Sequence, residues 1–107
     1  MRAPSVKTLY KRGFSEEQSR LIRAALLKGI EKRKPRTALT ECDRIMKSHG
    51  VEIITYTYRD DEYHLYYCNC GDTYDTTLMW DERTENFSVG AWGDFVEYGE
   101  RRGMHFH

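Results

Sequence analysis

The stretch SHGVEIITYTYR, residues 48–59, marks the point where the periodicity of the sequence changes. Before Gly50, apolar residues recur at the spacing of a helix; after it, β-branched and aromatic residues follow one another, which is typical of strands. Gly50 suits the end of a helix, because glycine adopts left-handed backbone angles at little steric cost. We therefore expect helices before this residue and strands after it.

Two helices are predicted in the first half of the chain. The first spans about residues 15–31, where Ser15 is a suitable N-cap and Gln18 completes a capping box. The second spans about residues 35–48, because Pro35 fits the first turn of a helix and apolar residues then repeat at helical spacing.

The second half of the chain predicts two consecutive antiparallel hairpins. Residues 51–59 and 63–68 have the composition of strands, and the acidic residues 60–62 between them suit a turn. Residues 76–81 and 86–91 form a second such pair around the polar stretch ERTE. The sequence thus predicts an α+β fold in which two N-terminal helices pack on a four-stranded antiparallel β-meander, leaving the other sheet face partly open.

The two ends of the chain have weaker patterns. Residues 1–13 are basic, and we expect them to be loosely ordered. The C-terminal segment WGDFVEYGERRGMHFH, residues 92–107, contains a short aromatic and acidic cluster that suits either a helical turn or a last strand. The whole chain, residues 1–107, is expected to form a single domain.

The composition indicates a globular protein outside the membrane. Of 107 residues, 39% are hydrophobic and 32% are charged. No apolar run approaches the roughly 20 residues that a membrane span requires, and the N-terminus lacks the apolar stretch of a signal peptide. We therefore expect a cytoplasmic location and no membrane partner.

The net charge of zero hides a strong separation of charge along the chain. Residues 1–49 carry 13 Lys and Arg against 5 Asp and Glu, a balance of +8, whereas residues 50–107 carry 4 against 12, a balance of −8. Such a separation suggests two surfaces suited to different partners. The alternative is that helix surfaces here use basic residues while loops between strands use acidic ones.

The acidic half combines carboxylates with Tyr and Trp residues, which are favoured anchors of protein interfaces. An acidic rim around an aromatic anchor could dock on a basic protein, with charge raising the association rate. Many of the aromatic residues would instead belong to the core, and a homodimer is a further possibility. The candidate partner-binding residues are Asp60, Asp61, Glu62, Asp72, Asp75, Trp92 and Asp94.

The basic half offers an alternative function in nucleic-acid binding. A basic cluster at the junction of the two helices could contact phosphates with strong salt dependence. The linker KGIEKRKPR is long for a helix-turn-helix motif, and a solvated helix surface would have the same composition. The basic cluster consists of Lys28, Lys32, Arg33, Lys34 and Arg36.

The stretch YYCNCGDTYDT, residues 66–76, raises the question of a metal site. Cys68 and Cys70 would point to one face of a strand, together with His64, and Asp72 follows closely, so a small zinc site is an alternative function. The C-x-C spacing differs from the usual C-x2-C of structural zinc sites, and a strand ending in a turn at Gly71 explains the same residues. We predict no metal and no cofactor.

Motifs for catalysis are also missing from the sequence. It contains no G-x-S-x-G, no H-E-x-x-H and no phosphate-binding loop. Cys42 lies within the helical pattern of residues 35–48 and is expected to be a small buried side chain. We therefore predict a protein that is not an enzyme and has no catalytic residues.

Three stretches together resemble a family of small phage- and prophage-encoded accessory proteins. They are SHGVEII, CNCGDTYDTTLMWD and FSVGAWGDFVE, and they contain the motifs H-G-V-E, G-D-T-Y and W-G-D. The similarity covers about residues 37–97. It implies a protein that binds and inhibits a host protein or a defence complex, as an anti-CRISPR protein does, and it implies no catalytic residue.

Overall fold

The computed structural model describes residues 2–51, 57–60, 64–70 and 76–103. The fold is of the α+β class with an antiparallel sheet, as the sequence predicts. The elements in chain order are α1 (Val6–Lys11), α2 (Glu16–Glu31), α3 (Pro35–Ser48), β1 (Thr57–Asp60), β2 (Leu65–Asn69), β3 (Thr77–Asp81), β4 (Asn86–Gly90) and α4 (Trp92–Arg101).

The strands lie in the order β1-β2-β3-β4, and each pairs with its sequence neighbours. Tyr67 in β2 is opposite Tyr58 and Met79 in the strands on either side. The predicted turn at residues 60–62 begins too early, because Asp60 still belongs to β1 and pairs with Leu65. The remainder of that turn and residues 52–56 of the first predicted strand lie outside the described residues.

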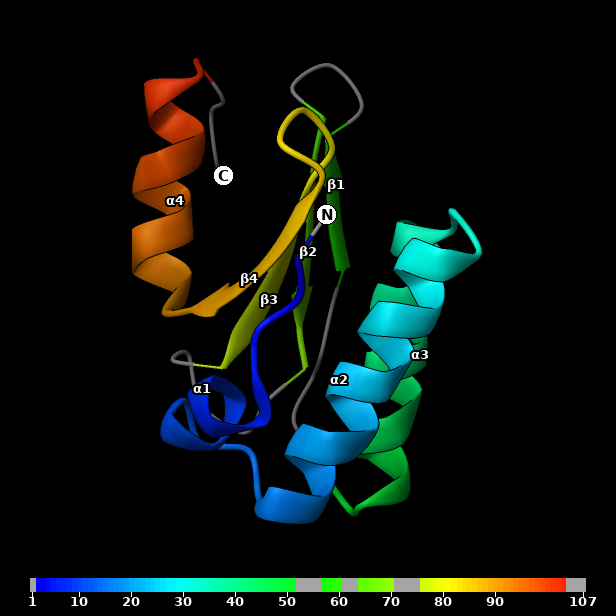
Figure 1. The fold of residues 1–107 in the computed structure, drawn as a ribbon. Coiled ribbons are helices and arrows are strands. Elements are labelled where there is room, and N and C mark those ends of the chain that lie inside the picture. Colours follow the sequence, from blue (N-terminus) through cyan, green and yellow to red (C-terminus); the bar gives the residue numbers. More distant parts are fainter. Residues whose placement is uncertain (1, 52–56, 61–63, 71–75, 104–107) are drawn as a thin grey trace.

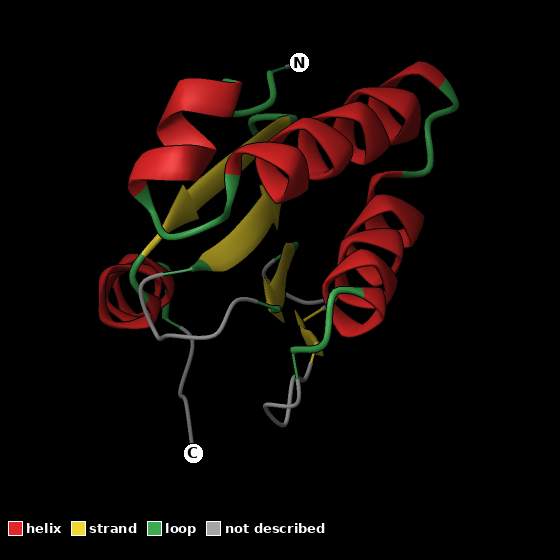
Figure 2. Ribbon diagram, turned by 90° about the horizontal axis from the view of Figure 1, so that it is seen from below, coloured by secondary structure: helices red, strands yellow, loops and turns green. Residues whose placement is uncertain are grey.

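The sheet lies between two layers of helices. In Figure 1, α2 and α3 are on one side of the strands and α4 is on the other, and Figure 2 shows the same arrangement from below. The second sheet face is therefore covered in part by α4, while Asn86 and Ser88 of β4 remain half-buried there. The prediction of two N-terminal helices is incomplete, because in the described part of the chain three helices precede the sheet and a fourth follows it.

Alternation along the strands supplies the two faces of the core. Tyr66 and Cys68 belong to the larger cluster, under the N-terminal helices, whereas Leu65 and Tyr67 belong to the smaller cluster with Phe95 of α4. Both β2 and β3 are buried along their whole length. A helix on each side of the sheet explains why these strands read as continuous runs of buried residues.

The capping signals locate α2 and α3 correctly. The Ser15 side chain accepts a hydrogen bond from the Gln18 backbone N–H at 3.1 Å, and the Gln18 side chain accepts one from the Ser15 N–H at 2.8 Å. Pro35 is the first residue of α3, as predicted. The two helices approach closely where Gly29 faces Ala38, since a Cβ atom at Gly29 would lie 2.4 Å from the Ala38 Cβ.

The short helix α1 corrects the prediction that residues 1–13 are loosely ordered. Ser5 caps it by accepting a hydrogen bond from the Thr8 N–H at 3.1 Å, and Leu9 is completely buried in the larger core cluster. Before α1, Arg2 forms a parallel bridge with Asn86, and the Phe87 N–H donates to the Arg2 carbonyl oxygen at 2.8 Å. The N-terminal segment therefore runs beside β4.

The C-terminal helix α4 resolves the two alternatives that the sequence left open for residues 92–107. Over its described part, the tail forms a helix of 10 residues and not a last strand. Phe95 anchors it on the sheet, where its ring lies close to Gly90. None of the helices in the described ranges combines the length and the apolar content needed to cross a bilayer.

Candidate functional site

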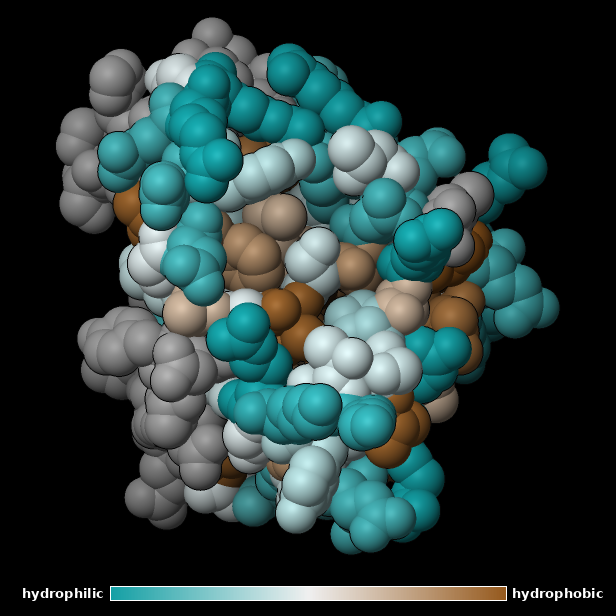
Figure 3. All heavy atoms as spheres, turned by 60° about the vertical axis from the view of Figure 1, so that its left-hand side comes forward, coloured by the Kyte–Doolittle hydropathy of each residue, from teal (hydrophilic) through white to brown (hydrophobic). Residues whose placement is uncertain are grey.

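The charge separation along the sequence corresponds only in part to opposite sides of the described sheet, because Glu82 and Glu85 lie beside the basic turn between α2 and α3. Exposed basic side chains gather at the junction of α2 and α3, whereas α4 exposes Asp94, Glu97 and Glu100. Figure 1 places these helices on opposite sides of the strands. Figure 3, which brings the side of α4 forward, shows hydrophilic side chains around a smaller hydrophobic patch.

The predicted acidic site is only partly within the described residues. Asp61, Glu62, Asp72 and Asp75 lie outside them, and the side chain of Asp60 is likewise not described. The two remaining candidates are brought together in the first turn of α4, where Asp94 is exposed and Trp92 is partly buried. 

The ring of Trp92 packs edge-on against the ring of Tyr67, with 5.5 Å between the ring centroids. Trp92 thus contributes to the smaller core cluster. This packing was not evident from the sequence, because it depends on α4 lying back across the sheet. Any role of Trp92 as an interface anchor is limited to the part of its ring that remains exposed.

The basic cluster spans the end of α2, the turn and the first turn of α3, and all five of its side chains are exposed. Arg33 occupies the turn with φ = 56°, a left-handed conformation that few non-glycine residues adopt. Arg36 is held toward the sheet: its guanidinium forms an ion pair with Glu82 at 3.1 Å and lies 4.2 Å from the centre of the Tyr66 ring.

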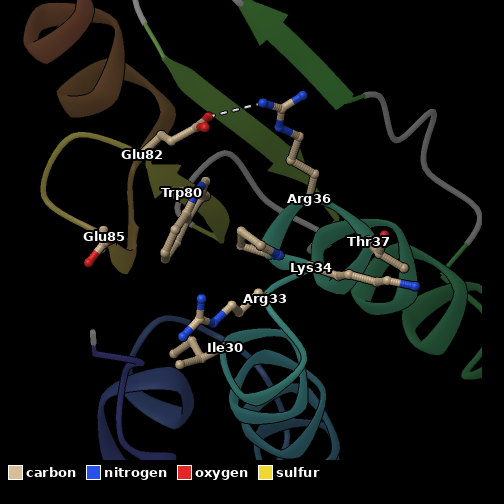
Figure 4. A pocket seen from close by; sticks show the side chains of 9 residues that line it. Ile30, Arg33, Lys34, Arg36, Thr37, Trp80, Glu82 and Glu85 are labelled. Carbon is tan, nitrogen blue, oxygen red and sulfur yellow. Dashed lines mark hydrogen bonds and ion pairs between the residues drawn. The ribbon is translucent and has the colours of Figure 1, made fainter.

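A cavity of about 540 Å³ opens between this turn and the sheet (Figure 4). Trp80 of β3 forms one wall; it is 4% exposed, and its indole Nε1 has no hydrogen-bond partner. A buried N–H without an acceptor is rare in proteins and unfavourable in free energy. The cavity is lined by Ile30, Arg33, Lys34, Pro35, Arg36, Thr37, Trp80, Glu82 and Glu85.

A second hollow of about 510 Å³ follows the outer surface of the α2–α3 hairpin. Its floor contains small and apolar side chains, including Ala24 and Ala25, and its rim is basic apart from Glu41. Lys34 and Thr37 line both hollows, so the basic turn separates an inner cavity from an outer groove.

The side of the sheet that α4 covers carries a buried ionic cluster that sequence reasoning missed. Arg102 donates to both carboxylate oxygens of Asp81, at 3.1 and 2.7 Å, and the Tyr98 hydroxyl donates to the same carboxylate at 2.6 Å. The Arg83 backbone N–H adds a fourth hydrogen bond at 3.0 Å. The Asp81 side chain is 3% exposed and that of Arg102 is 16% exposed. 

These contacts decide the ionisation of Asp81. Burial by itself would raise the pKa of Asp81, but hydrogen bonds from Tyr98, Arg102 and the Arg83 backbone outweigh it and hold the pKa below the ordinary 3.8. For Tyr98, burial and the hydrogen bond to Asp81 raise the pKa of the phenol. The cluster therefore joins the end of α4 to β3 as a charged, fully bonded pair, which indicates a structural role.

The three cysteines are buried in the larger core cluster. Cys42 is completely buried, as predicted, and this burial raises the pKa of its thiol well above the ordinary value. A hydrogen bond with Cys70, together with burial, raises the pKa of Cys68 strongly. Because the thiolate is the reactive form, these two thiols are poor nucleophiles.

The structure does not bring His64 to the cysteines. His64 lies in the turn before β2, is exposed and has φ = 58°, so the strand alternation assumed for it does not apply. Within the described ranges, no group of three or more His, Cys, Asp or Glu side chains is arranged to hold a metal ion. Asp72, the fourth predicted ligand, lies outside those ranges.

Comparison with known proteins identifies no relative for this arrangement. The chain matches no protein-family model, no curated protein and no solved structure.

Proposed function

We propose that the chain is an accessory binding protein, without enzymatic activity, that binds and inhibits a host or defence protein through an acidic surface on the α4 side. Within the described residues this acidic surface consists of Asp94, Glu97 and Glu100. Asp60, Asp61, Glu62, Asp72 and Asp75 stay partner-binding candidates from the sequence alone. The observation that carries the proposal is the exposure of these three carboxylates on α4, on the side of the sheet opposite the basic α2–α3 turn.

Charge of one sign on one surface suits recognition of a partner of the opposite sign. Exposed carboxylates that are not neutralised by neighbours attract a basic protein over a distance of about 10 Å at moderate salt. On α4 the described compensation is one weak pair, Glu97 with Arg101 at 3.5 Å, in which both side chains are largely exposed. Asp94 and Glu100 form no ion pair with a described residue, so most of the acidic charge faces solvent.

The chemistry of the thiols argues against Cys42 and Cys68 as catalytic nucleophiles. Cys42 and Cys68, the two thiols whose pKa is raised, are shielded from solvent and protonated at neutral pH. The phage accessory role rests on the similarity of three sequence stretches, and the inhibitory role follows from it.

The test compares capture of a host protein by matched charge variants. Immobilised protein is incubated with nuclease-treated host lysate, and the captured protein is identified and purified. Asp94→Lys with Glu97→Lys should then reduce its association rate about tenfold or more at low salt, because surface charges mainly steer encounter. Lys28→Glu with Lys32→Glu, a change of charge of equal size and opposite sign on the other side, is the control and should leave the rate nearly unchanged.

Circular dichroism and thermal melting show whether each variant keeps its fold. If the α4 variant associates as fast as the original protein while the α2–α3 variant is slowed, the acidic-surface proposal is wrong. The same result would favour the second candidate surface described next.

The second candidate function is binding of nucleic acid by the basic cluster. The observation that favours it is that Lys28, Lys32 and Lys34 are exposed and form no ion pair with a described carboxylate. We expect weak association that declines steeply with salt, because phosphate contacts release counterions. Charge reversal at Lys32, Arg33 and Lys34 together should abolish it. Tight and sequence-selective binding at physiological salt would move this function to first place.

A further inference from the structure

The cavity beside the α2–α3 turn shares Arg33, Lys34 and Arg36 with the basic cluster, but it also contains a buried tryptophan and two glutamates that neither macromolecular function uses. It is about 540 Å³ in volume, and its walls come from two parts of the chain, the α2–α3 turn and the β3–β4 hairpin. Pockets of roughly 300–1,000 Å³ with a few convergent polar groups are typical of small-molecule sites. The polar side chains that line it are two arginines, one lysine, one threonine, two glutamates and a buried tryptophan.

The indole of Trp80 supplies a donor without an acceptor. Trp80 is 4% exposed, lines the cavity and has no hydrogen-bond partner at Nε1. Figure 4 shows its ring between the side chains of Arg33 and Arg36. A ligand oxygen that reaches this N–H would satisfy it.

The start of α3 adds positive electrostatic potential at the same place. This helix of 14 residues begins at Pro35, and its N-cap, Lys34, makes no side-chain hydrogen bond to the first turn. Backbone N–H groups and the helix dipole therefore favour an anion here. Arg33 and Arg36 lie on the cavity side of the turn, whereas the Lys34 ammonium group points away from Trp80 (Figure 4).

The opposite wall carries Glu82 and Glu85, so the site is not uniformly basic. Glu82 is paired with Arg36, and Glu85 forms no ion pair with a described residue. Carboxylates accept hydrogen bonds only, which suits hydroxyl or amino groups on a ligand. The two walls together fit a molecule that has an anionic end and a hydroxyl-bearing end.

We propose that this cavity binds a small phosphate monoester of a sugar or nucleoside. The phosphate oxygens accept hydrogen bonds from Arg33, Arg36 and the Trp80 indole, and the sugar hydroxyls donate to Glu85. Arginine suits the phosphate because its guanidinium donates two parallel hydrogen bonds to such an anion. The site holds the ligand and carries out no reaction on it.

The test is a titration followed by NMR, in which the indole N–H of Trp80 reports directly on the cavity. The Trp92→Phe variant assigns the two tryptophan indole signals. We expect adenosine 5′-monophosphate and glucose 6-phosphate to shift the Trp80 signal in saturable titrations. Adenosine should bind at least about tenfold more weakly than its monophosphate, because it lacks the phosphate and so loses the charge-assisted hydrogen bonds to the arginines. 

Two variants test the walls separately. Arg33→Ala should weaken both phosphate esters about tenfold or more, whereas Arg20→Ala, an exposed arginine of α2 paired with Glu16, is the matched control and should leave binding unchanged. Glu85→Gln should weaken glucose 6-phosphate more than inorganic phosphate. All three side chains are exposed, so the fold should be retained, and thermal melting verifies it.

The outcomes decide the proposal independently of the acidic surface on α4. Equal binding of adenosine and its monophosphate, or equal binding by the Arg33→Ala and Arg20→Ala proteins, would overturn it. A Trp80 signal that stays unchanged up to about 10 mM ligand would also overturn it, because this concentration is well above the dissociation constant of a specific small-molecule site. Comparing inorganic phosphate with the two phosphate esters tests the role of Glu85. If inorganic phosphate binds as tightly as the esters, Glu85 does not contact the sugar hydroxyls.

Discussion

Replacing Asp81 by asparagine should lower the free energy of unfolding by about 3 kcal/mol, the usual cost of breaking a buried ion pair from one side. The asparagine keeps the size of the side chain but removes the charge that faces Arg102. It also points an amide donor at the donors of Arg102 and Tyr98, which at present share the carboxylate. Because Asp81 is 3% exposed, water cannot replace the lost contacts around it.

The loss should be measured by urea denaturation, followed by far-ultraviolet circular dichroism. For a domain of this size, about 3 kcal/mol corresponds to a fall of roughly 15 °C in melting temperature. The matched control is Glu97→Gln, which breaks the exposed pair with Arg101 on the same helix. Such surface pairs contribute little, so the control should lose less than about 0.5 kcal/mol.

The effect should also depend on pH in one direction. The folded pKa of Asp81 lies below the ordinary 3.8, so its ionisation adds stability that is fully present above the unfolded pKa. That stability disappears as the pH falls through the folded pKa, where the carboxylate becomes protonated. The difference between the original protein and Asp81→Asn should therefore shrink below about pH 4. A difference that is the same at acid and neutral pH, or equal to that of Glu97→Gln, would refute the reasoning.

Two further predictions concern the helix contact and the thiols. Gly29→Ala should destabilise the protein by about 1–3 kcal/mol in urea titration, because its Cβ would meet the Ala38 side chain. At Gly93 on α4 an added Cβ would have no atom within 4 Å, so Gly93→Ala should instead stabilise the protein by about 0.5–1 kcal/mol. If both substitutions change the free energy of unfolding in the same direction, the close contact at Gly29 is contradicted. Cys42 and Cys68 should react with a thiol reagent slowly in the native protein and fully in denaturant, and fast native labelling would disprove their burial.

Local signals in the sequence located the elements whose ends are fixed by nearby residues. Ser15 and Gln18 predict the start of α2 because capping depends on residues three apart in the sequence. The same logic failed for α4, whose N-cap Ala91 makes no side-chain hydrogen bond and whose helix includes Gly93 and Gly99. Helix propensity there is low, and packing of Phe95 on the sheet provides the stability instead.

The candidate sites divide in the same way. The basic cluster was evident because its residues are adjacent in the sequence. The cavity was not evident, because Trp80 and Glu85 are far from the turn in the sequence and lie beside it only in the folded chain. The ion pair of Asp81 with Arg102 joins residues 21 positions apart, and no spacing rule connects them.

The bridge between Arg2 and Asn86 has a consequence for how the protein behaves in concentrated solution. β4 is a terminal strand of the described sheet, and such strands offer unpaired backbone groups to other molecules. The Arg2 carbonyl oxygen accepts a hydrogen bond from one of these groups, the Phe87 N–H, at 2.8 Å. The N-terminal segment therefore covers part of the exposed edge of β4, and we expect that removing it would favour self-association through this strand.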